Sequence, residues 1–179
     1  MRNDVTNKVY ILSGPAGVGK STTSKKLVTK LNPSAFISGD YISHMHINGR
    51  KKPWESEEEV SLIWNNILCL TRNFLTYGNN VVIDYVTFPK EAQWLCTNIK
   101  DPNVEVRYVV LWTNKETLVK RDNSRIPEER MGERSIILMN EFIESKIEEQ
   151  HFFDTSNVNI ENVDYVIEQI ITNNRFKLT

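Results

Sequence analysis

Cysteines are few in this chain of 179 residues, and no apolar run approaches the length of a membrane span. Cys69 and Cys96 lack the spacing of metal ligands. Cys69 falls on an apolar helical face, so we expect a reduced core residue there. Residues Met1–Asp4 are not followed by the apolar region of a signal peptide. We therefore expect a cytoplasmic protein without a membrane partner.

Net charge is almost absent as well. The chain has 22 lysines and arginines against 23 aspartates and glutamates, a formal net charge of −1. This balance excludes a broad electrostatic attraction to a nucleic-acid backbone, so we expect no nucleic-acid partner. Internal repeats and low-complexity linkers are also lacking. Together with the length, this predicts a single domain over residues 1–179.

What the sequence does contain is a phosphate-binding motif. Residues 14–21, GPAGVGKS, fit the pattern G-x-x-x-x-G-K-[ST], after an apolar strand and before a helix. In such a loop the backbone N–H groups turn toward phosphate oxygens, and the helix N-terminus adds its dipole. Lys20 is expected to reach the β- and γ-phosphates of a nucleotide, and Ser21 to bind Mg²⁺. The expected nucleotide site comprises Gly14, Pro15, Ala16, Gly17, Val18, Gly19, Lys20, Ser21 and Thr22.

Strand-like and helix-like segments alternate along the whole chain. Short apolar or β-branched segments predict strands at 9–13, 35–38, 81–84, 104–112 and 151–155. Helices are predicted at 20–31, 57–77, 135–150 and 163–172. In the second helix, Ser56 and Glu59 suggest a capping box and Gly78 a stop. The alternation predicts an α/β fold, with a parallel sheet between two layers of helices.

Two aspartates follow predicted strands. Asp40 comes after the second strand and Asp84 ends the third. Ligands of open α/β sheets bind beyond the carboxyl ends of the strands. We therefore expect Asp40 to orient a substrate hydroxyl and accept its proton, and Asp84 to ligate Mg²⁺ or contact the substrate. The alternative for either residue is a cap on the following helix.

Two further segments are candidates for parts of a site. Basic residues at 120–134, interrupted by Pro127 and Gly132, predict a lid over about 121–134 in which Arg121 and Arg125 meet phosphate oxygens. The alternative is a solvated, salt-bridged helix end. Residues of about 41–56 predict a substrate cap, with His44 as a hydrogen-bond partner of the substrate or, alternatively, a surface histidine. Residues 152–157 are a candidate adenine contact or, alternatively, a strand followed by an Asx or Ser/Thr turn.

In this order, the segments GPAGVGKST, SGD, VVIDY, RDNSR and DTSN resemble the small P-loop kinases of the nucleoside-monophosphate-kinase fold. Within that group the chain is most similar to gluconate-kinase-like, shikimate-kinase-like and chloramphenicol-phosphotransferase-like proteins. The resemblance implies a three-layer P-loop NTPase fold with a five-stranded parallel sheet of order 2-3-1-4-5. It also implies ATP and Mg²⁺, phosphoryl transfer to a small-molecule hydroxyl, a substrate-side carboxylate at Asp40, and lid arginines at Arg121 and Arg125.

The segment SHMHI at 43–47 is more apolar than its counterpart in gluconate kinases, and DYV at 84–86 replaces the glycine-rich turn of shikimate kinases. The function expected is an ATP-dependent kinase acting on a small-molecule hydroxyl, such as that of a sugar acid like gluconate, in a monomer or homodimer. The alternatives are a polynucleotide 5′-hydroxyl kinase and a non-catalytic nucleotide-binding regulator. The expected catalytic residues are Lys20, Asp40 and Arg125, the substrate-binding residues Asp40, His44 and Asp84, and the metal ligands Ser21 and Asp84.

Overall fold

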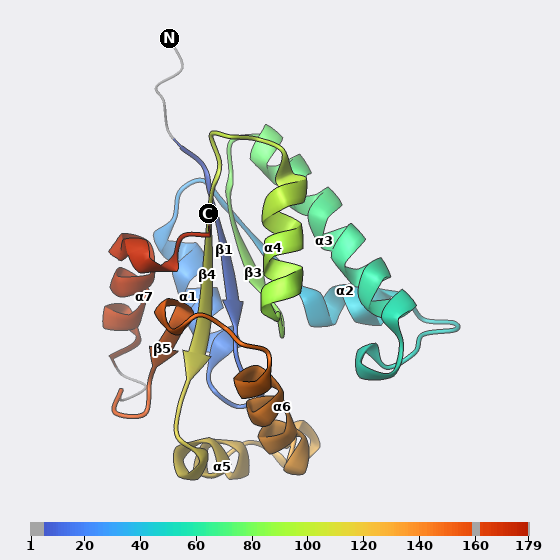
Figure 1. The fold of residues 1–179 in the computed structure, drawn as a ribbon, viewed down its shortest axis with the longest axis vertical. Helices are drawn as coiled ribbons and strands as arrows, with labels where there is room; N and C mark the ends of the chain where they lie inside the picture. The colour runs from blue at the N-terminus through green and yellow to red at the C-terminus, as the bar shows by residue number, and fades with distance from the viewer. Residues whose placement is uncertain (1–5, 159–161, 179) are drawn as a thin grey trace.

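The fold is built on a parallel sheet of five strands in the order β2-β3-β1-β4-β5 (Figure 1). The computed structural model describes residues 6–158 and 162–178, so the N-terminal residues Met1–Asp4 lie outside the described part. The sheet and its order confirm the predicted fold class. The strands are β1 (Lys8–Ser13), β2 (Ser34–Ser38), β3 (Asn80–Asp84), β4 (Glu105–Trp112) and β5 (Phe152–Asp154).

The central strands are buried on both faces because helices cover both. Alternate residues of β1 point to opposite sides, so Val9 and Ile11 join one hydrophobic cluster while Tyr10 and Leu12 join the other. The Tyr10 cluster packs under α1 (Lys20–Lys30) and α7 (Val163–Thr172). The Val9 cluster packs under α3 (Glu57–Thr76) and α4 (Pro89–Ile99). The two layers are visible on either side of the sheet in Figure 1.

The start of α3 differs in one respect from the predicted capping box. Ser56 Oγ accepts a hydrogen bond from the N–H of Glu59, as expected. The Glu59 carboxylate does not return to Ser56. It is buried and lies 2.9 Å from His46 Nδ1, and it accepts a hydrogen bond from the N–H of Lys51. Glu59 thus holds the segment between α2 and α3 in place.

The expectation for Cys69 is wrong, because its side chain is exposed. The buried stripe of α3 contains Ile63, Ile67 and Thr71, spaced by four residues. A helix turns by about 100° per residue, which puts Cys69 on the opposite side of α3 from this stripe.

Several boundaries also differ from the prediction. The segment after β2 begins with a short helix, α2 (Gly39–Met45), before the 3₁₀ turn η1 (Pro53–Glu55). Helix α6 (Glu133–Glu144) ends six residues earlier than predicted, because Lys146 has a positive φ of 54°. Helices α4 and α5 (Lys115–Asn123) were not predicted at all. Gly78, with φ of 79°, does follow the end of α3 as expected.

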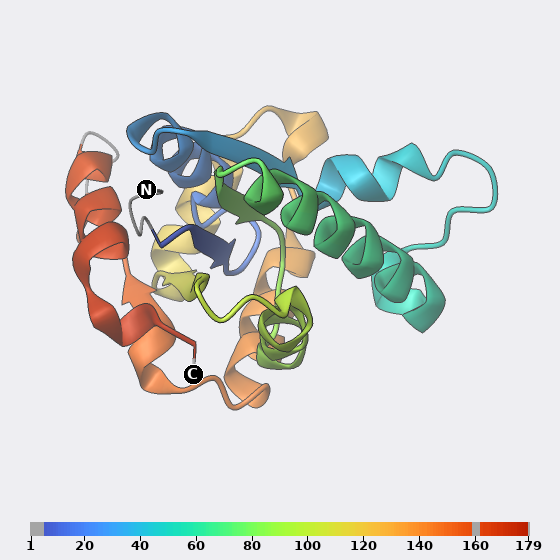
Figure 2. The ribbon, with the colours of Figure 1, turned by 90° about the horizontal axis from the view of Figure 1, so that it is seen from above.

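This topology gathers the candidate residues at one end of the sheet. All five strands run in the same direction, and α5 and α6 lie at their carboxyl ends (Figure 1). Figure 2 shows the connection between α2 and α3 projecting away from the sheet. Within the described residues, the search for a helix both long and apolar enough to cross a membrane finds none.

Candidate active site

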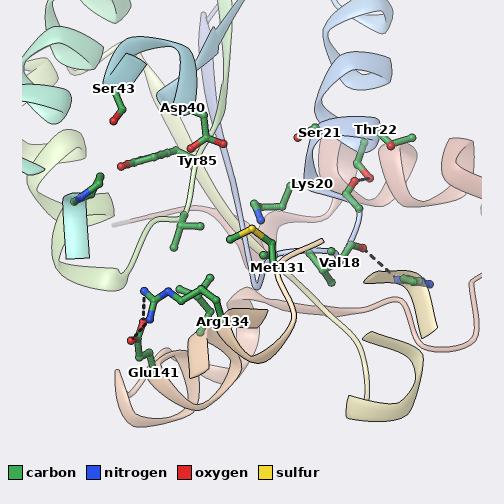
Figure 3. Close-up of a pocket in the computed structure, with 18 of the residues that line it drawn as sticks. Val18, Lys20, Ser21, Thr22, Asp40, Ser43, Tyr85, Met131, Arg134 and Glu141 are labelled. Atoms are coloured by element: carbon green, nitrogen blue, oxygen red, sulfur yellow. Dashed lines mark hydrogen bonds and ion pairs between the residues drawn. The ribbon is translucent and has the colours of Figure 1, made fainter. Parts of the chain in front are cut away.

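A cavity of about 1040 Å³ lies at the carboxyl end of the sheet. Figure 3 shows its two sides, with Ser21 and Thr22 on one and Arg134 and Glu141 on the other. We call the side formed by residues 16–23, by residues in and just after α5, by Thr155 and Val158 after β5, and by residues of α7 the P-loop half. The distal half is formed by side chains from α2, η1, α3, α4, α6 and their connections. Its chemically informative members are Asp40, Ser43, Arg50, Trp54, Trp64, Tyr85, Phe88, Glu91, Arg134 and Glu141.

The phosphate-binding motif forms the connection from β1 to α1. Gly14 has φ of 131°, and a Cβ there would lie 2.3 Å from the carbonyl oxygen of Leu111, so no other residue fits. Gly19 begins α1 with φ of 106° and provides no side-chain cap, and the first turn contains no acidic residue. The N–H groups and the positive dipole end of α1 therefore remain available to an anion.

Lys20 lies at the centre of this loop. Its ammonium donates hydrogen bonds to the carbonyl oxygens of Gly14, at 2.9 Å, and Pro15, at 3.0 Å. Burial lowers the pKa of Lys20, whereas the charges of Asp84 and Asp40 act in the opposite direction. Lys20 is thus a desolvated cation near two carboxylates, placed in Figure 3 between the two halves.

Ser21 and Asp84 bring two side-chain oxygens together at the loop. Asp84 is buried, and burial raises the pKa of its carboxyl, while a hydrogen bond with Ser21 and the charge of Lys20 lower it. Magnesium prefers such hard oxygen ligands. Within the described residues there is no group of three or more His, Cys, Asp or Glu side chains able to hold a metal ion. An ion at Ser21 and Asp84 therefore needs further oxygens from a nucleotide or water.

Asp84 is not among the described residues that line the cavity, whereas its carboxyl forms a hydrogen bond with Ser21. Neither aspartate is the cap that the alternative reading required. Ser38 caps α2 by accepting a hydrogen bond from the N–H of Tyr41, and the residue before α4 is Phe88. The metal role of Asp84 and its substrate role both stay predictions, and its position favours the first.

Asp40 lines the cavity from the first turn of α2. The glycine before it is required by packing: a Cβ on Gly39 would lie 2.2 Å from Cγ of Tyr85. The Tyr85 ring therefore lies directly beneath the start of α2, close to Asp40 and Ser43 (Figure 3). His44 also lines the cavity, but its Nδ1 lies 2.7 Å from the carbonyl oxygen of Asp40, so one ring nitrogen is already committed within the helix.

The two predicted lid arginines have different surroundings. Arg121 donates to the carbonyl oxygen of Val18 at 3.2 Å, and to Oγ1 and O of Thr155 at 3.1 and 3.0 Å. It thus ties the motif to the end of β5, where Asp154 forms an Asx turn with the N–H of Ser156. Arg125 is half-buried in the cavity wall, and its charge acts on Lys20. Arg125 is the better placed of the two for a phosphoryl group.

The sequence analysis missed the residue that anchors the lid. The Asp122 carboxylate is buried and accepts hydrogen bonds from the N–H groups of Met131, at 3.0 Å, and Gly132, at 2.8 Å. It also pairs with Arg125 at 3.8 Å. One carboxylate therefore holds both the beginning and the end of the lid. Its position directly before Asn123 and Ser124 gave no signal for this role.

Of the distal half, the sequence analysis predicted Asp40 and the substrate cap at about 41–56, which contains Ser43, Arg50 and Trp54, but it missed the residues from α3, α4 and α6. Arg134 of α6 forms a two-pronged ion pair with Glu141, at 2.9 and 3.3 Å, and its guanidinium lies 5.2 Å from the ring centre of Trp54. Arg50 donates two hydrogen bonds to the hydroxyl of Ser43. No continuous motif contains these residues, so only their placement in the fold brings them together.

The sheet topology and the phosphate-binding loop together define a P-loop kinase fold of the α/β class. A family model described as an AAA domain (AAA_33) matches residues 9–143, and the chain belongs to this family. Its members have a P-loop kinase fold, which confirms the resemblance inferred from the motifs. The curated proteins include no significant match to this chain.

Solved structures support the same fold. A sugar kinase from Janibacter sp. HTCC2649 is 14% identical, with 93% of this chain and 94% of that chain covered and a TM-score of 0.66. A tunicamycin resistance protein from Deinococcus radiodurans is 16% identical, with 92% and 93% covered and a TM-score of 0.63. A gluconokinase from Sinorhizobium meliloti 1021 is 13% identical, with 94% and 98% covered and a TM-score of 0.59. At these identities the likeness concerns the fold alone.

Proposed function

We propose that this protein is an ATP-dependent kinase that transfers the γ-phosphoryl group to a hydroxyl of a small molecule. The observation that carries the proposal is one cavity in which a P-loop with Lys20 faces a second compartment that begins at Asp40. Phosphoryl transfer needs a nucleotide and an acceptor held in line, with little other chemistry from the protein. A cavity with two such compartments suits this task.

The residues present fit both ATP and Mg²⁺. The glycine conformations at Gly14 and Gly19 leave a backbone cradle and an uncapped helix N-terminus for a polyphosphate. Ser21 and Asp84 supply the oxygen ligands for the ion. When bound, Mg²⁺ supplies charge neutralisation on the phosphate oxygens.

The chain's own residues then have distinct tasks. Asp40 orients the acceptor hydroxyl and accepts its proton as the oxygen attacks phosphorus. The ammonium of Lys20 leaves the carbonyl oxygens of Gly14 and Pro15 and offsets the charge of the transferred group. Arg125 adds a second positive charge from the lid. The products are the phosphorylated acceptor and ADP, and the proton on Asp40 returns to solvent.

The acceptor proposed from the sequence is a sugar acid such as gluconate. The two alternatives, a polynucleotide 5′-hydroxyl kinase and a regulator that binds nucleotide without transfer, make different demands. A polynucleotide kinase requires a path for an anionic strand, whereas a regulator requires no acceptor compartment. The distal half of the cavity supports an acceptor rather than a regulator.

Calorimetry with ATP and Mg²⁺, followed by an ATP-consumption screen, tests the proposal. The screen should include sugar acids, neutral polyols, nucleosides, hydroxylated antibiotics and an oligonucleotide with a 5′-hydroxyl. We expect micromolar nucleotide binding and acceptor-dependent formation of ADP for one small-molecule class. Lack of binding to adenosine and guanosine triphosphates would overturn the proposal. Binding without any turnover supports the regulator, and labelling of the oligonucleotide supports the polynucleotide kinase.

A further inference from the structure

The wall of the distal half is largely aromatic. Trp54, Trp64, Tyr85 and Phe88 all line it, and they come from three different places in the chain. Trp64 is buried and packs edge-on against Tyr85, with ring centres 5.9 Å apart. Phe88 packs against Phe142, with ring centres 4.7 Å apart. Rings held by such contacts present fixed apolar faces to a ligand.

The cations of this half are already committed to partners. Arg134 is bound by both carboxylate oxygens of Glu141. Lys52 pairs with Glu55 at 3.2 Å, and its ammonium lies 5.7 Å from the ring centre of Trp54. Arg50 donates to Ser43, and its charge helps to lower the pKa of the buried Glu59 carboxyl. Within the described lining, each of these three cations therefore has an intramolecular partner.

The other charged side chains of this half are carboxylates, one of which, Glu141, is the partner of Arg134. Asp40, Glu91 and Glu141 line it, against the three cations Arg50, Lys52 and Arg134. A carboxylate entering here loses hydration, and it must either compete with Glu141 for Arg134, whose unpartnered Nε is buried, or displace the hydrogen bonds of Arg50 to Ser43. Releasing Glu141 from Arg134 leaves another carboxylate beside the ligand. Both routes disfavour an anionic acceptor and leave a neutral one unaffected.

We propose that the acceptor is an uncharged, ring-bearing alcohol that lies against Trp54 and Tyr85, and that the Arg134–Glu141 pair excludes carboxylate acceptors. This inference rests on the proposed kinase function and narrows it. Under this inference the acceptor is not a sugar acid. Arg134 and Glu141 are then specificity determinants, and Glu141 acts by keeping the guanidinium occupied.

Two probes that differ only in the charge of one group distinguish recognition of the rings from recognition of the charge. Phenyl β-D-glucopyranoside and phenyl β-D-glucuronide share both rings and differ in one CH₂OH or carboxylate group. Their affinities can be measured by quenching of tryptophan fluorescence, because Trp54 and Trp64 line the cavity. We expect the wild-type protein to bind the glucoside at least about tenfold more tightly than the glucuronide. Methyl β-D-glucopyranoside, which lacks the phenyl ring, should bind about tenfold more weakly than the phenyl compound.

The variant Glu141→Gln releases Arg134 and is expected to gain about tenfold in affinity for the glucuronide, with little change for the glucoside. Glu144→Gln, an exposed position on the same helix, is the matched control and should change neither affinity. Circular dichroism confirms that both variants fold. If Glu141→Gln does not fold, the wild-type ratio of the two phenyl compounds decides by itself.

Equal or tighter binding of the glucuronide by the wild type overturns the inference, and so does failure to bind either phenyl compound. These measurements need no nucleotide. Calorimetry with ATP and Mg²⁺ on the same preparation therefore tests the kinase function separately. A protein that binds ATP but prefers the glucuronide keeps the proposed function and loses the acceptor class.

Discussion

The two halves of the cavity are built in different ways. The P-loop half is centred on the main chain of one continuous segment, and the shape of that segment follows from the glycines that let the backbone turn. The distal half is made of side chains from α2, η1, α3, α4 and α6, and its shape follows from packing. A site made of backbone groups recognises the phosphates that all nucleotides share. In a site made of side chains, a single substitution can change which ligand binds. The difference predicts that substitutions in the two halves have separable effects.

The largest effect is expected from Lys20→Ala, in the P-loop half. Removal of the ammonium should lower the turnover number by at least about a hundredfold, because the developing phosphate charge loses a preorganised counter-charge. The fold should be retained, since the hydrogen bonds lost are only those to Gly14 and Pro15. Steady-state kinetics and a thermal melt measure both. Lys26→Ala, at an exposed position of α1, is the control, and unchanged turnover in Lys20→Ala would contradict the mechanism.

The second largest effect is expected from Asp40→Asn, at the start of the distal half. The amide keeps the shape but cannot accept the proton, so we expect turnover to fall about a hundredfold. Affinity for ATP should change by less than about twofold, since Asp40 lies across the cavity from the P-loop. Kinetics and calorimetry separate the two quantities. Asp164→Asn, exposed on α7 and paired with Lys30, is the control. Similar losses in both quantities would show that Asp40 is a metal or structural residue.

A smaller effect, on stability, should follow from Gly39→Ala. The added Cβ collides with the Tyr85 ring, and the displacement should cost about 2 kcal/mol of unfolding free energy, measured in urea. In a Tyr85→Ala background the ring is gone and only the Cβ of residue 85, at 2.7 Å, still crowds the added carbon, so the same change should cost clearly less. An identical cost in both backgrounds would show that the close approach of Gly39 and Tyr85 is not the cause.

The smallest effect, a gain, is expected from Asp84→Asn. Burial raises the pKa of this carboxyl in the folded protein, so the folded state disfavours the ionised form. The free energy of unfolding therefore falls as the pH rises above 3.8, the ordinary pKa of an aspartate. At pH 7 the neutral amide avoids this loss, so the variant should be more stable by less than Gly39→Ala is destabilised. Urea unfolding at pH 7 and near pH 3 checks this. The difference should vanish at the lower pH, and a variant less stable at pH 7 would refute the argument.

The same contrast explains what the sequence could predict. The residues 14–21 form a site by local backbone geometry, so their order alone was sufficient. Asp40 and Asp84 were placed at one end of the sheet because parallel strands share a direction. Tyr85, Trp54 and Arg134 belong to three separate elements, and only tertiary packing brings them to one cavity. Asp122 was missed for the same reason, because its partners are main-chain groups nine and ten residues away.

The position of Asp122 has a practical consequence. Since its carboxylate meets both Arg125 and the N–H groups of Met131 and Gly132, residues 122–132 close into a ring on the surface of the molecule. A ring tethered at one point can be exchanged as a unit, and its length can vary with little effect on the sheet. The corresponding segments of other proteins with this fold should therefore be transplantable between Asp122 and Gly132, which makes residues 122–132 a natural place to re-engineer the protein.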